Sequence, residues 1–295
     1  MSNSKTQAWL LANNKYTKEN VTRLTFGKAK TISVASGKGG VGKTSISLKF
    51  SKTLSKQGYK VLLIDCDYNL SNTAIKLGLP LNNDFYKLIT SRISLDECLH
   101  KQGKFHLLSA CSGNIEMFEE AESYSRHIIN LINKCEDDYD YIILDSPAGL
   151  NKDILTLNAY CDDRFIVVTP DRSSITDSYS LLKILNKNYG IKENHLIVNK
   201  ISTQNQFNRL VKSLSETVDS FLSCRLKVLG AVELETMAVD LFDKLLTGKK
   251  EKFAFDNNFI KMVKIFTEEY SEGFVVNHDS FASNKVRHDV QTTIS

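Results

Sequence analysis

Short apolar runs alternate with longer amphipathic stretches along most of the chain. A short, continuous apolar run is typical of a strand that is buried on both faces of a parallel sheet. Such runs predict strands at 31–35, 61–64, 105–109, 141–145, 164–169, 195–200 and 228–232. Helical spacing predicts helices at 44–57, 82–90, 94–101, 116–135, 151–160, 174–188, 204–222, 236–247 and 258–270. The alternation predicts an α/β fold, with a mostly parallel twisted sheet that carries helices on both faces.

The same pattern predicts one large domain, residues 31–250, with a segment on either side of it. Residues 1–30 are polar apart from a small apolar cluster around Trp9, which indicates either a short helix that docks on the rest of the protein or a frayed terminus. Residues 251–270 predict an amphipathic helix with Phe259, Met262, Val263 and Phe266 on one side. Residues 271–295 are polar and mixed in charge, which predicts a disordered tail.

Composition and charge narrow the class of protein. A net charge of +4 is too small to indicate nucleic-acid binding. The six cysteines are scattered without metal-site spacing, so we expect reduced thiols. No charged-then-apolar leader opens the chain, and no apolar run approaches the roughly 18 residues that a membrane span needs. We therefore expect a cytoplasmic protein, with peripheral contact on the inner face of the cell membrane as the other option.

A glycine-rich loop follows the first predicted strand and leads into the first predicted helix. Its sequence is Gly37-Lys38-Gly39-Gly40-Val41-Gly42-Lys43-Thr44, and Ser45 follows it. A phosphate-binding loop requires this strand–loop–helix context. The four glycines allow positive φ and let backbone amides approach an anion at the helix N-terminus. In such a loop Lys43 reaches the β- and γ-phosphates and Thr44 places its hydroxyl on Mg²⁺, so the sequence predicts a nucleoside triphosphate site.

Polar residues lie at the ends of three further predicted strands. Asp65 and Asp67 follow the run 61–64, and Asp145 ends the run 141–145. Parallel sheets bind ligands at the carboxyl ends of their strands, and an apolar strand that ends in Asp holds Mg²⁺ in many nucleotide hydrolases. Asn199 lies near the end of the run 195–200. Its amide can both donate and accept, which matches the edge of adenine, although a capping or turn role is an open alternative.

Lys38 is not part of the minimal phosphate-loop motif. With this lysine the loop resembles that of the deviant Walker A ATPases, a family of P-loop NTPases that includes MinD, ParA, the nitrogenase iron protein and the flagellar regulator FlhG. The segment Asp145-Ser146-Pro147-Ala148-Gly149 is the same as switch II of MinD. The resemblance implies an ATP-dependent homodimer with nucleotides sandwiched at its interface. In such a dimer Lys38 reaches the phosphates of the nucleotide that is bound by the facing subunit.

The resemblance also implies roles for individual residues. The stretch after the run 61–64, with Asn69 and Asn72, resembles switch I of the family. It implies that Asp67 positions the attacking water and that Asp65 supports Mg²⁺ through a water. The implied catalytic residues are Lys38, Lys43 and Asp67, and the implied metal site is Thr44, Asp65 and Asp145. The implied cofactors are ATP and Mg²⁺, and the implied activity is a slow ATPase that depends on dimerisation.

Three cellular roles follow from the resemblance. The favoured role is an FlhG-like regulator of flagellar number or placement, because Gln7, Ala8 and Leu11 keep the spacing of the FlhG segment that stimulates the signal-recognition-like GTPase FlhF. A MinD-type ATPase that positions the division site is the alternative, and a ParA-type DNA-partitioning ATPase is the least favoured. In FlhG and MinD a C-terminal amphipathic helix binds the membrane, which implies reversible membrane contact through residues 251–270. A helix that closes the core is the other interpretation of that segment.

Overall fold

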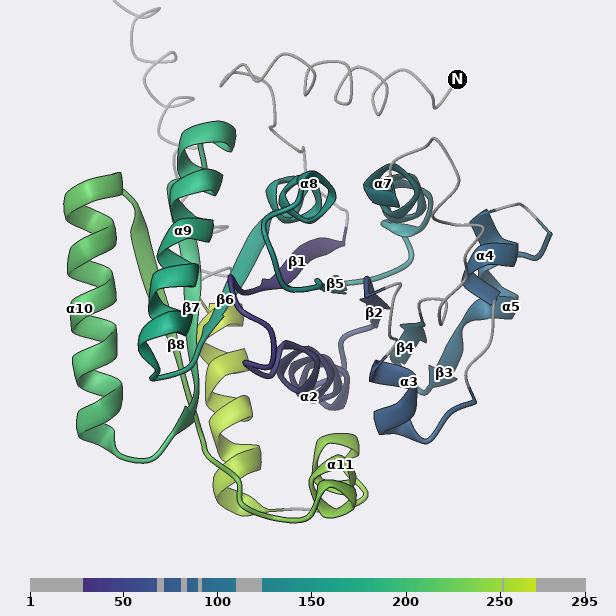
Figure 1. Cartoon of the computed structure of the whole chain (residues 1–295). Helices are drawn as coiled ribbons and strands as arrows, with labels where there is room; N and C mark the ends of the chain where they lie inside the picture. The colour runs from purple at the N-terminus through teal and green to yellow at the C-terminus, as the bar shows by residue number, and fades with distance from the viewer. Residues whose placement is uncertain are drawn as a thin grey trace, which may run out of the picture.

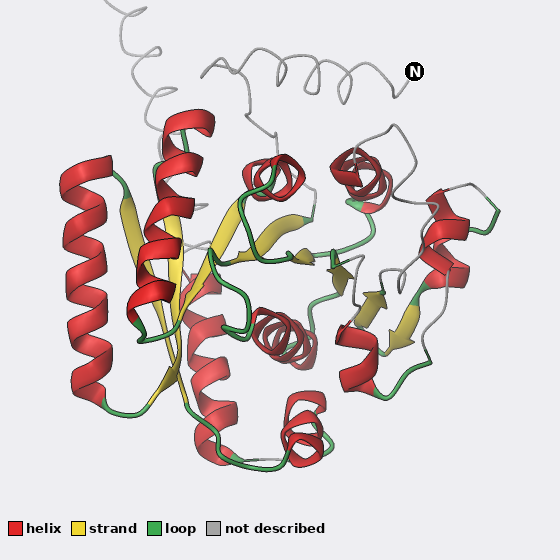
Figure 2. Ribbon diagram, viewed as in Figure 1, coloured by secondary structure: helices red, strands yellow, loops and turns green. Residues whose placement is uncertain are grey.

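The computed structural model describes residues 29–67, 72–80, 84–89, 92–109, 124–250 and 252–268. Within these ranges eight strands form one sheet (Figures 1 and 2). The strands are β1 (Lys30–Ala35), β2 (Val61–Asp65), β3 (His100–Gln102), β4 (Phe105–Leu108), β5 (Tyr141–Asp145), β6 (Asp163–Val168), β7 (Glu193–Ile201) and β8 (Arg225–Glu233). Their order across the sheet is β3-β4-β2-β5-β1-β6-β7-β8. Every neighbouring pair is parallel except β3 with β4, which confirms the predicted mostly parallel sheet.

Helices cover both faces of the sheet (Figure 1). The described helices are α2 (Lys43–Lys56), α3 (Asn72–Leu77), α4 (Asp84–Ile89), α5 (Leu95–Cys98), α7 (Tyr124–Cys135), α8 (Lys152–Tyr160), α9 (Arg172–Tyr189), α10 (Gln204–Leu222), α11 (Val239–Thr247) and residues 253–268. One face packs against α2, α11 and the helix of residues 253–268, and the other packs against α7, α8, α9 and α10. Successive strand residues point to opposite faces of the sheet, and both faces of β2 and β5 are covered. Every residue of these two strands is therefore buried, which explains their continuous apolar runs.

The hairpin at one edge of the sheet differs from the prediction. The sequence predicts a helix over 94–101, but α5 ends at Cys98 and the chain then forms β3. β3 pairs antiparallel with β4 across a turn in which Gly103 has a φ of 59°. Strand pairing with an adjacent segment here outweighs the local helical spacing. The short helix α3 is also absent from the sequence prediction, and α9 begins at Arg172, two residues before the predicted start.

The helix of residues 253–268 is part of the core. It begins five residues before the predicted start at 258, and Phe259, Met262, Val263 and Phe266 are buried against the sheet. Met262 packs over Gly230 of β8, where a Cβ atom would lie 3.1 Å from the methionine side chain. The interpretation of this helix as a core-closing element is therefore the one that the structure supports. Its apolar side is not available to a membrane in this arrangement, and membrane contact stays a prediction.

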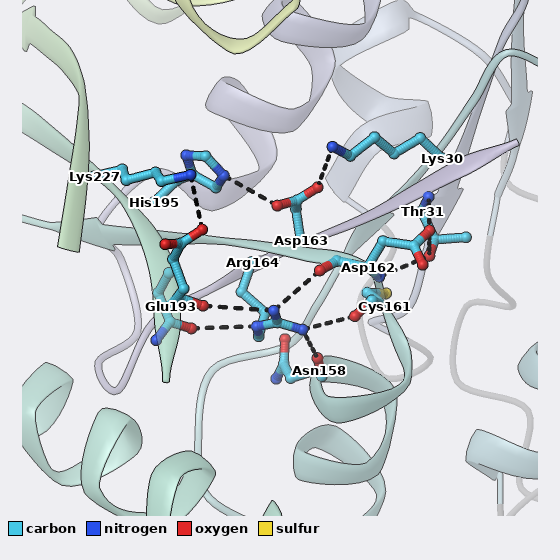
Figure 3. Close-up of polar contacts among 11 residues, drawn as sticks. Lys30, Thr31, Asn158, Cys161, Asp162, Asp163, Arg164, Glu193, His195 and Lys227 are labelled. Atoms are coloured by element: carbon cyan, nitrogen blue, oxygen red, sulfur yellow. Dashed lines mark hydrogen bonds and ion pairs between the residues drawn. The ribbon is translucent and has the colours of Figure 1, made fainter. Parts of the chain in front are cut away.

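Charged side chains gather at the amino-terminal ends of β1, β6, β7 and β8 (Figure 3). We call this group the amino-end cluster; it consists of Lys30, Asp163, Arg164, Glu193, His195 and Lys227. Asp163 accepts from Lys30 Nζ at 2.8 Å and lies 3.0 Å from His195 Nε2. Lys30 Nζ also lies 4.8 Å from the centre of the Phe266 ring. The cluster thus joins the start of the sheet to the last described turn of the C-terminal helix.

Several predictions fall outside the described residues. These are residues 1–28 of the N-terminal extension with its Gln7-Ala8-x-x-Leu11 segment, Asn69 of the switch I stretch, and the tail 271–295. Asn72 opens α3, and its side chain is outside the described part of the chain as well. Among the described helices, none has the length and apolar character that crossing a bilayer would demand.

Candidate functional site

The glycine-rich loop connects the carboxyl end of β1 to the N-terminus of α2. Gly40 and Gly42 have φ values of 75° and 100°, in the left-handed region that favours glycine. Gly37 is needed for another reason, because a Cβ atom there would lie 2.2 Å from the carbonyl oxygen of Asp177 in α9. The expectation of positive φ at all four glycines is therefore wrong for Gly37 and Gly39. Close packing against α9 explains why position 37 is a glycine.

Lys43 is the buried cation of the site. Its side chain is 8% exposed, and its Nζ donates to the hydroxyl of Ser36 at 2.9 Å. Burial lowers the pKa of Lys43, while the charges of Asp145 and Asp67 act in the opposite direction. Among the residues that the structure describes, none forms an ion pair with Lys43 as short as its hydrogen bond to Ser36, so a phosphate group that enters the loop would be a strong partner for it.

Two carboxylates lie side by side at the carboxyl ends of β2 and β5. Asp65 and Asp145 are opposite each other in the strand register, and both are almost completely buried. The hydroxyl of Ser47 lies 3.0 Å from Asp145 Oδ1, and the hydroxyls of Thr44 and Ser47 both act to lower the pKa of this carboxylate. Burial and the neighbouring charge of Asp65 nevertheless raise the pKa of Asp145 well above its ordinary value. A cation bound here would offset this repulsion.

The donor set of this corner fits Mg²⁺. It offers the Thr44 hydroxyl and two carboxylates, which are the hard oxygen ligands that Mg²⁺ prefers. Among the described residues, no three His, Cys, Asp or Glu side chains form a metal-binding group. Mg²⁺ does not require one, because it usually keeps several waters and binds one or two carboxylates together with substrate phosphates. Asp65 also accepts from the backbone amides of Asp67 and Thr73, at 3.0 and 3.3 Å, so it positions the start of the switch I stretch.

Lys38 lies at the surface and contacts α9. Its side chain is 40% exposed, and its Nζ donates to Asp171 Oδ1 at 2.9 Å and lies 2.7 Å from the hydroxyl of Ser173. Asp171 is the N-cap of α9, where its carboxylate accepts from the amide of Ser174 at 2.9 Å. Hydrogen bonds from Thr169, Lys38 and Ser173 hold the pKa of Asp171 below its usual range. The sequence alone assigned no role to Asp171 or Ser173.

Asn199 and Lys200 tie the end of β7 to the phosphate loop. Asn199 Nδ2 donates to the carbonyl of Val41 at 2.7 Å, and Lys200 Nζ donates to the carbonyl of Gly40 at 2.7 Å. Lys200 has a φ of 60°, which is uncommon for a residue other than glycine. The described contact of Asn199 is therefore one that holds the loop, and its role in recognising adenine stays a prediction. Lys200 is a site residue that sequence reasoning missed.

These elements enclose one cavity of about 520 Å³. Its lining includes the predicted residues Gly39, Gly40, Gly42, Lys43, Thr44, Ser45, Asp67, Asp145, Ser146, Pro147, Ala148 and Asn199. The loop after β8 closes another side, where Lys252 Nζ lies 2.7 and 2.8 Å from the two carboxylate oxygens of Glu235. Gly149 follows the lining residues with a φ of 125°. The structure thus brings the predicted loop, the acidic strand ends and switch II to one cavity, while Lys38 faces α9.

Comparison with known proteins identifies the family. A family model described as an AAA domain matches residues 29–198, which is more than half of the chain. The chain belongs to this AAA-domain family. The structural features above and the relatives below confirm the resemblance to the MinD/ParA-type ATPases with a deviant Walker A loop.

Two relatives each match about 70% of this chain, and one of them is a flagellar protein by name. The antiactivator FleN of Pseudomonas aeruginosa is 28% identical over 204 residues, which cover 69% of this chain and 73% of FleN. The flagellum site-determining protein YlxH of Helicobacter pylori is 30% identical over 214 residues, which cover 70% of each chain. Among solved structures, the septum site-determining protein MinD of Pyrococcus horikoshii in complex with Mg-ADP has a TM-score of 0.66. It is 21% identical, covers 81% of this chain and 96% of its own, and shows that the fold is shared.

Proposed function

We propose that this protein is an ATP-dependent dimerisation switch that binds and slowly hydrolyses ATP with Mg²⁺. The arrangement of Lys43, the loop amides and the buried carboxylates around one cavity supports a nucleoside triphosphate as the ligand. The Mg-ADP complex of the Pyrococcus MinD, which has the same fold, supports the same ligand class. The observation that carries the dimer is the position of Lys38, which belongs to the phosphate loop but contacts α9 at the surface.

The residues of the site would act in distinct ways. Lys43 and the amides of the loop bind the phosphates and stabilise negative charge on the transferred phosphoryl group. Mg²⁺ neutralises charge on the β- and γ-phosphate oxygens when it is bound. Asp67 accepts a hydrogen bond from the attacking water and orients it. Asp145 and Thr44 would hold the Mg²⁺ ion. Lys38 exchanges its contact with Asp171 for the phosphates of the facing subunit, so the site is completed only in the dimer.

The test compares oligomeric state with nucleotide binding. Wild-type protein is expected to elute as a dimer with Mg-ATP and as a monomer with Mg-ADP in gel filtration. Lys38→Ala is expected to bind ATP but to stay monomeric, because the loop keeps Lys43 while the cross-subunit contact is lost. Asp67→Ala is expected to remain a dimer in ATP, since the attacking water is no longer oriented. Lys212→Ala, an exposed lysine on α10, is the matched control and should behave as wild type.

A dimer of unchanged stability in Lys38→Ala would refute the role of Lys38. A wild-type protein that stays monomeric while ATP is demonstrably bound would refute the switch itself. Normal phosphate release by Asp67→Ala would remove that residue from the catalytic assignment.

For the cellular role we propose an FlhG-like regulator of flagellar number or placement. The name of one relative, the flagellum site-determining protein YlxH, which is matched over 70% of this chain, supports it. Under this proposal a signal-recognition-like GTPase of the FlhF type is a partner, and the protein is cytoplasmic with reversible membrane contact. Deleting the gene should change the number or position of flagella. Minicells with normal flagella would instead favour a MinD-type role, and salt-sensitive DNA binding would favour a ParA-type role.

A further inference from the structure

Three buried hydroxyls follow one another along α2. Each lies within hydrogen-bond distance of the carbonyl four residues earlier: Ser47 with Lys43 at 2.9 Å, Ser51 with Ser47 at 2.7 Å, and Thr53 with Lys49 at 2.8 Å. Such a contact is ordinary for a hydroxyl inside a helix. Ser47 differs from the other two because its Oγ also lies 3.0 Å from Asp145 Oδ1.

The Ser47 hydroxyl lies within hydrogen-bond distance of two acceptors. A serine hydroxyl carries one hydrogen, so it can donate either to the carbonyl of Lys43 or to Asp145. An ionised carboxylate is the stronger acceptor, because its hydrogen bonds are assisted by charge. Ser47 is 0% exposed and Asp145 is 3% exposed, so bulk water does not compete for either group. With Asp145 ionised, the hydrogen of Ser47 therefore points at Oδ1.

This contact defines the orientation of the Asp145 carboxylate. Ser47 lies one helical turn after Thr44, and its hydroxyl reaches Asp145 Oδ1 at 3.0 Å. A carboxylate that is held through one oxygen by α2 presents its second oxygen in a defined direction. The Thr44 oxygen is the one that the phosphate-loop motif assigns to the metal. The motif assigns no such role to Ser47, so its contact with Asp145 can serve to orient the carboxylate.

We infer that Ser47 is a positioning residue for Mg²⁺, which it favours by holding the Asp145 carboxylate in place. The inference rests on the proposed function, because it assumes a Mg-nucleotide in the cavity. It concerns only the coupling between metal and nucleotide. Ser47 itself is not among the residues that line the cavity, so nucleotide affinity without metal should not depend on it.

The experiment measures the binding of a fluorescent ADP analogue to the full chain, first in EDTA and then across a Mg²⁺ titration. ADP is used so that hydrolysis and ATP-dependent dimerisation do not enter. Ser47→Ala is expected to raise the half-saturating Mg²⁺ concentration about tenfold, the lower end of what a hydrogen bond to a charged group contributes. Its affinity for the analogue in EDTA is expected to equal that of wild type.

Two further variants separate the hydrogen bond from packing. Ser47→Cys fills the position with a somewhat larger thiol that is a weak donor, so it leaves no cavity but should require more Mg²⁺ in the same way as Ser47→Ala. Ser51→Ala removes an equally buried hydroxyl from the same helix, one that lacks a carboxylate partner among the described contacts, and should leave the Mg²⁺ requirement unchanged. Thermal unfolding of each variant reports on whether it is folded.

The outcomes distinguish the inference from the proposed function. A wild-type protein that responds to Mg²⁺ while Ser47→Ala and Ser47→Cys respond identically to it would overturn the inference alone. An equal shift in Ser51→Ala would also overturn it, because the effect would then belong to the helix. A wild-type protein whose affinity for the ADP analogue ignores Mg²⁺ would overturn the proposed function, and this inference with it.

Discussion

The buried carboxylates at the two ends of the central sheet have opposite surroundings. At the carboxyl end, Asp65 and Asp145 lie side by side in a buried corner, and the pKa of Asp145 is raised by burial and by its neighbour. At the amino end, Asp163 is also largely buried, but Lys30 and His195 contact its two oxygens. Burial alone would raise the pKa of Asp163, yet these contacts outweigh it and hold the pKa below the usual range.

The difference shows which end is built for a ligand. Charges that are matched within the chain stabilise the fold, because the pairs form when the chain folds. Buried charges of the same sign lower the stability of the fold, and a ligand of opposite charge that binds the folded protein raises it again. The carboxyl end holds two buried carboxylates beside a buried lysine whose pKa is lowered, which suits a metal and a phosphate chain. The amino end already contains its own counter-ions (Figure 3).

The largest expected effect on stability is at the amino end. Asp163→Asn leaves Lys30 and His195 without their shared anion, and we expect the free energy of unfolding to fall by about 2 to 3 kcal/mol. This is below the full cost of breaking a deeply buried pair, because the Asp163 side chain is 19% exposed. Urea unfolding at pH 7 measures the change, and nucleotide affinity in the folded variant should match that of wild type.

The stability difference between wild type and Asp163→Asn should also depend on pH. The pKa of Asp163 is lower in the folded state than in the unfolded chain, where a value of about 3.9 is typical. Its stabilisation is therefore fully present above that value and is lost as the pH falls through the folded-state pKa. Wild type and Asp163→Asn should show the full difference at pH 7, and the difference should shrink as the pH falls from about 4 towards 2. A difference that stays constant across this range would contradict the ionic origin of the effect.

A smaller effect on stability, of the opposite sign, is expected at the carboxyl end. Asp145→Asn removes one of two adjacent buried charges, so in EDTA the free energy of unfolding should stay unchanged or rise by up to about 1 kcal/mol. The same variant should lose the dependence of nucleotide affinity on Mg²⁺. If it were destabilised as strongly as Asp163→Asn, the two ends of the sheet would not differ in the way described.

The smallest effect is expected within the amino-end cluster itself. Glu193 pairs with Lys227 at 2.7 Å, but their side chains are 50% and 27% exposed. Solvent screens a pair of this kind, so Glu193→Gln should change the free energy of unfolding by less than about 1 kcal/mol. This variant is a matched control for Asp163→Asn, because it breaks an ion pair of similar length in the same cluster. An equal loss in both would mean that burial is not what makes Asp163 important.

The functional core of the protein was largely predictable from the sequence. The glycine-rich loop, Asp145 and the alternation of strands and helices were each identified from contiguous residues, and the structure places the loop and the acid at one cavity. Such features are local: a run of apolar residues fixes a buried strand, and the residue after it is delivered to the edge of the sheet. The reason for glycine at position 37 was not predictable, because the backbone of α9 that requires it is far away in the sequence.

The hairpin of β3 and the helix of residues 253–268 show the same limit. Residues 94–101 have helical spacing, but pairing with β4 decides the conformation of residues 100–102. The amphipathic pattern of the C-terminal helix fits both a membrane surface and a protein core. Packing of Phe259 and Phe266 against the sheet shows which of the two surfaces it covers in this structure.

By itself, the sequence determined that a phosphate loop and buried acids stand at the carboxyl end of a parallel sheet. Only the tertiary structure decided what each side chain contacts: Lys38 with Asp171, Asn199 with the carbonyl of Val41, and Ser47 with Asp145. The physical reason is one of range. Backbone conformation and the burial of a strand depend on neighbouring residues, whereas these hydrogen bonds join segments that meet only after the helices have packed on the sheet.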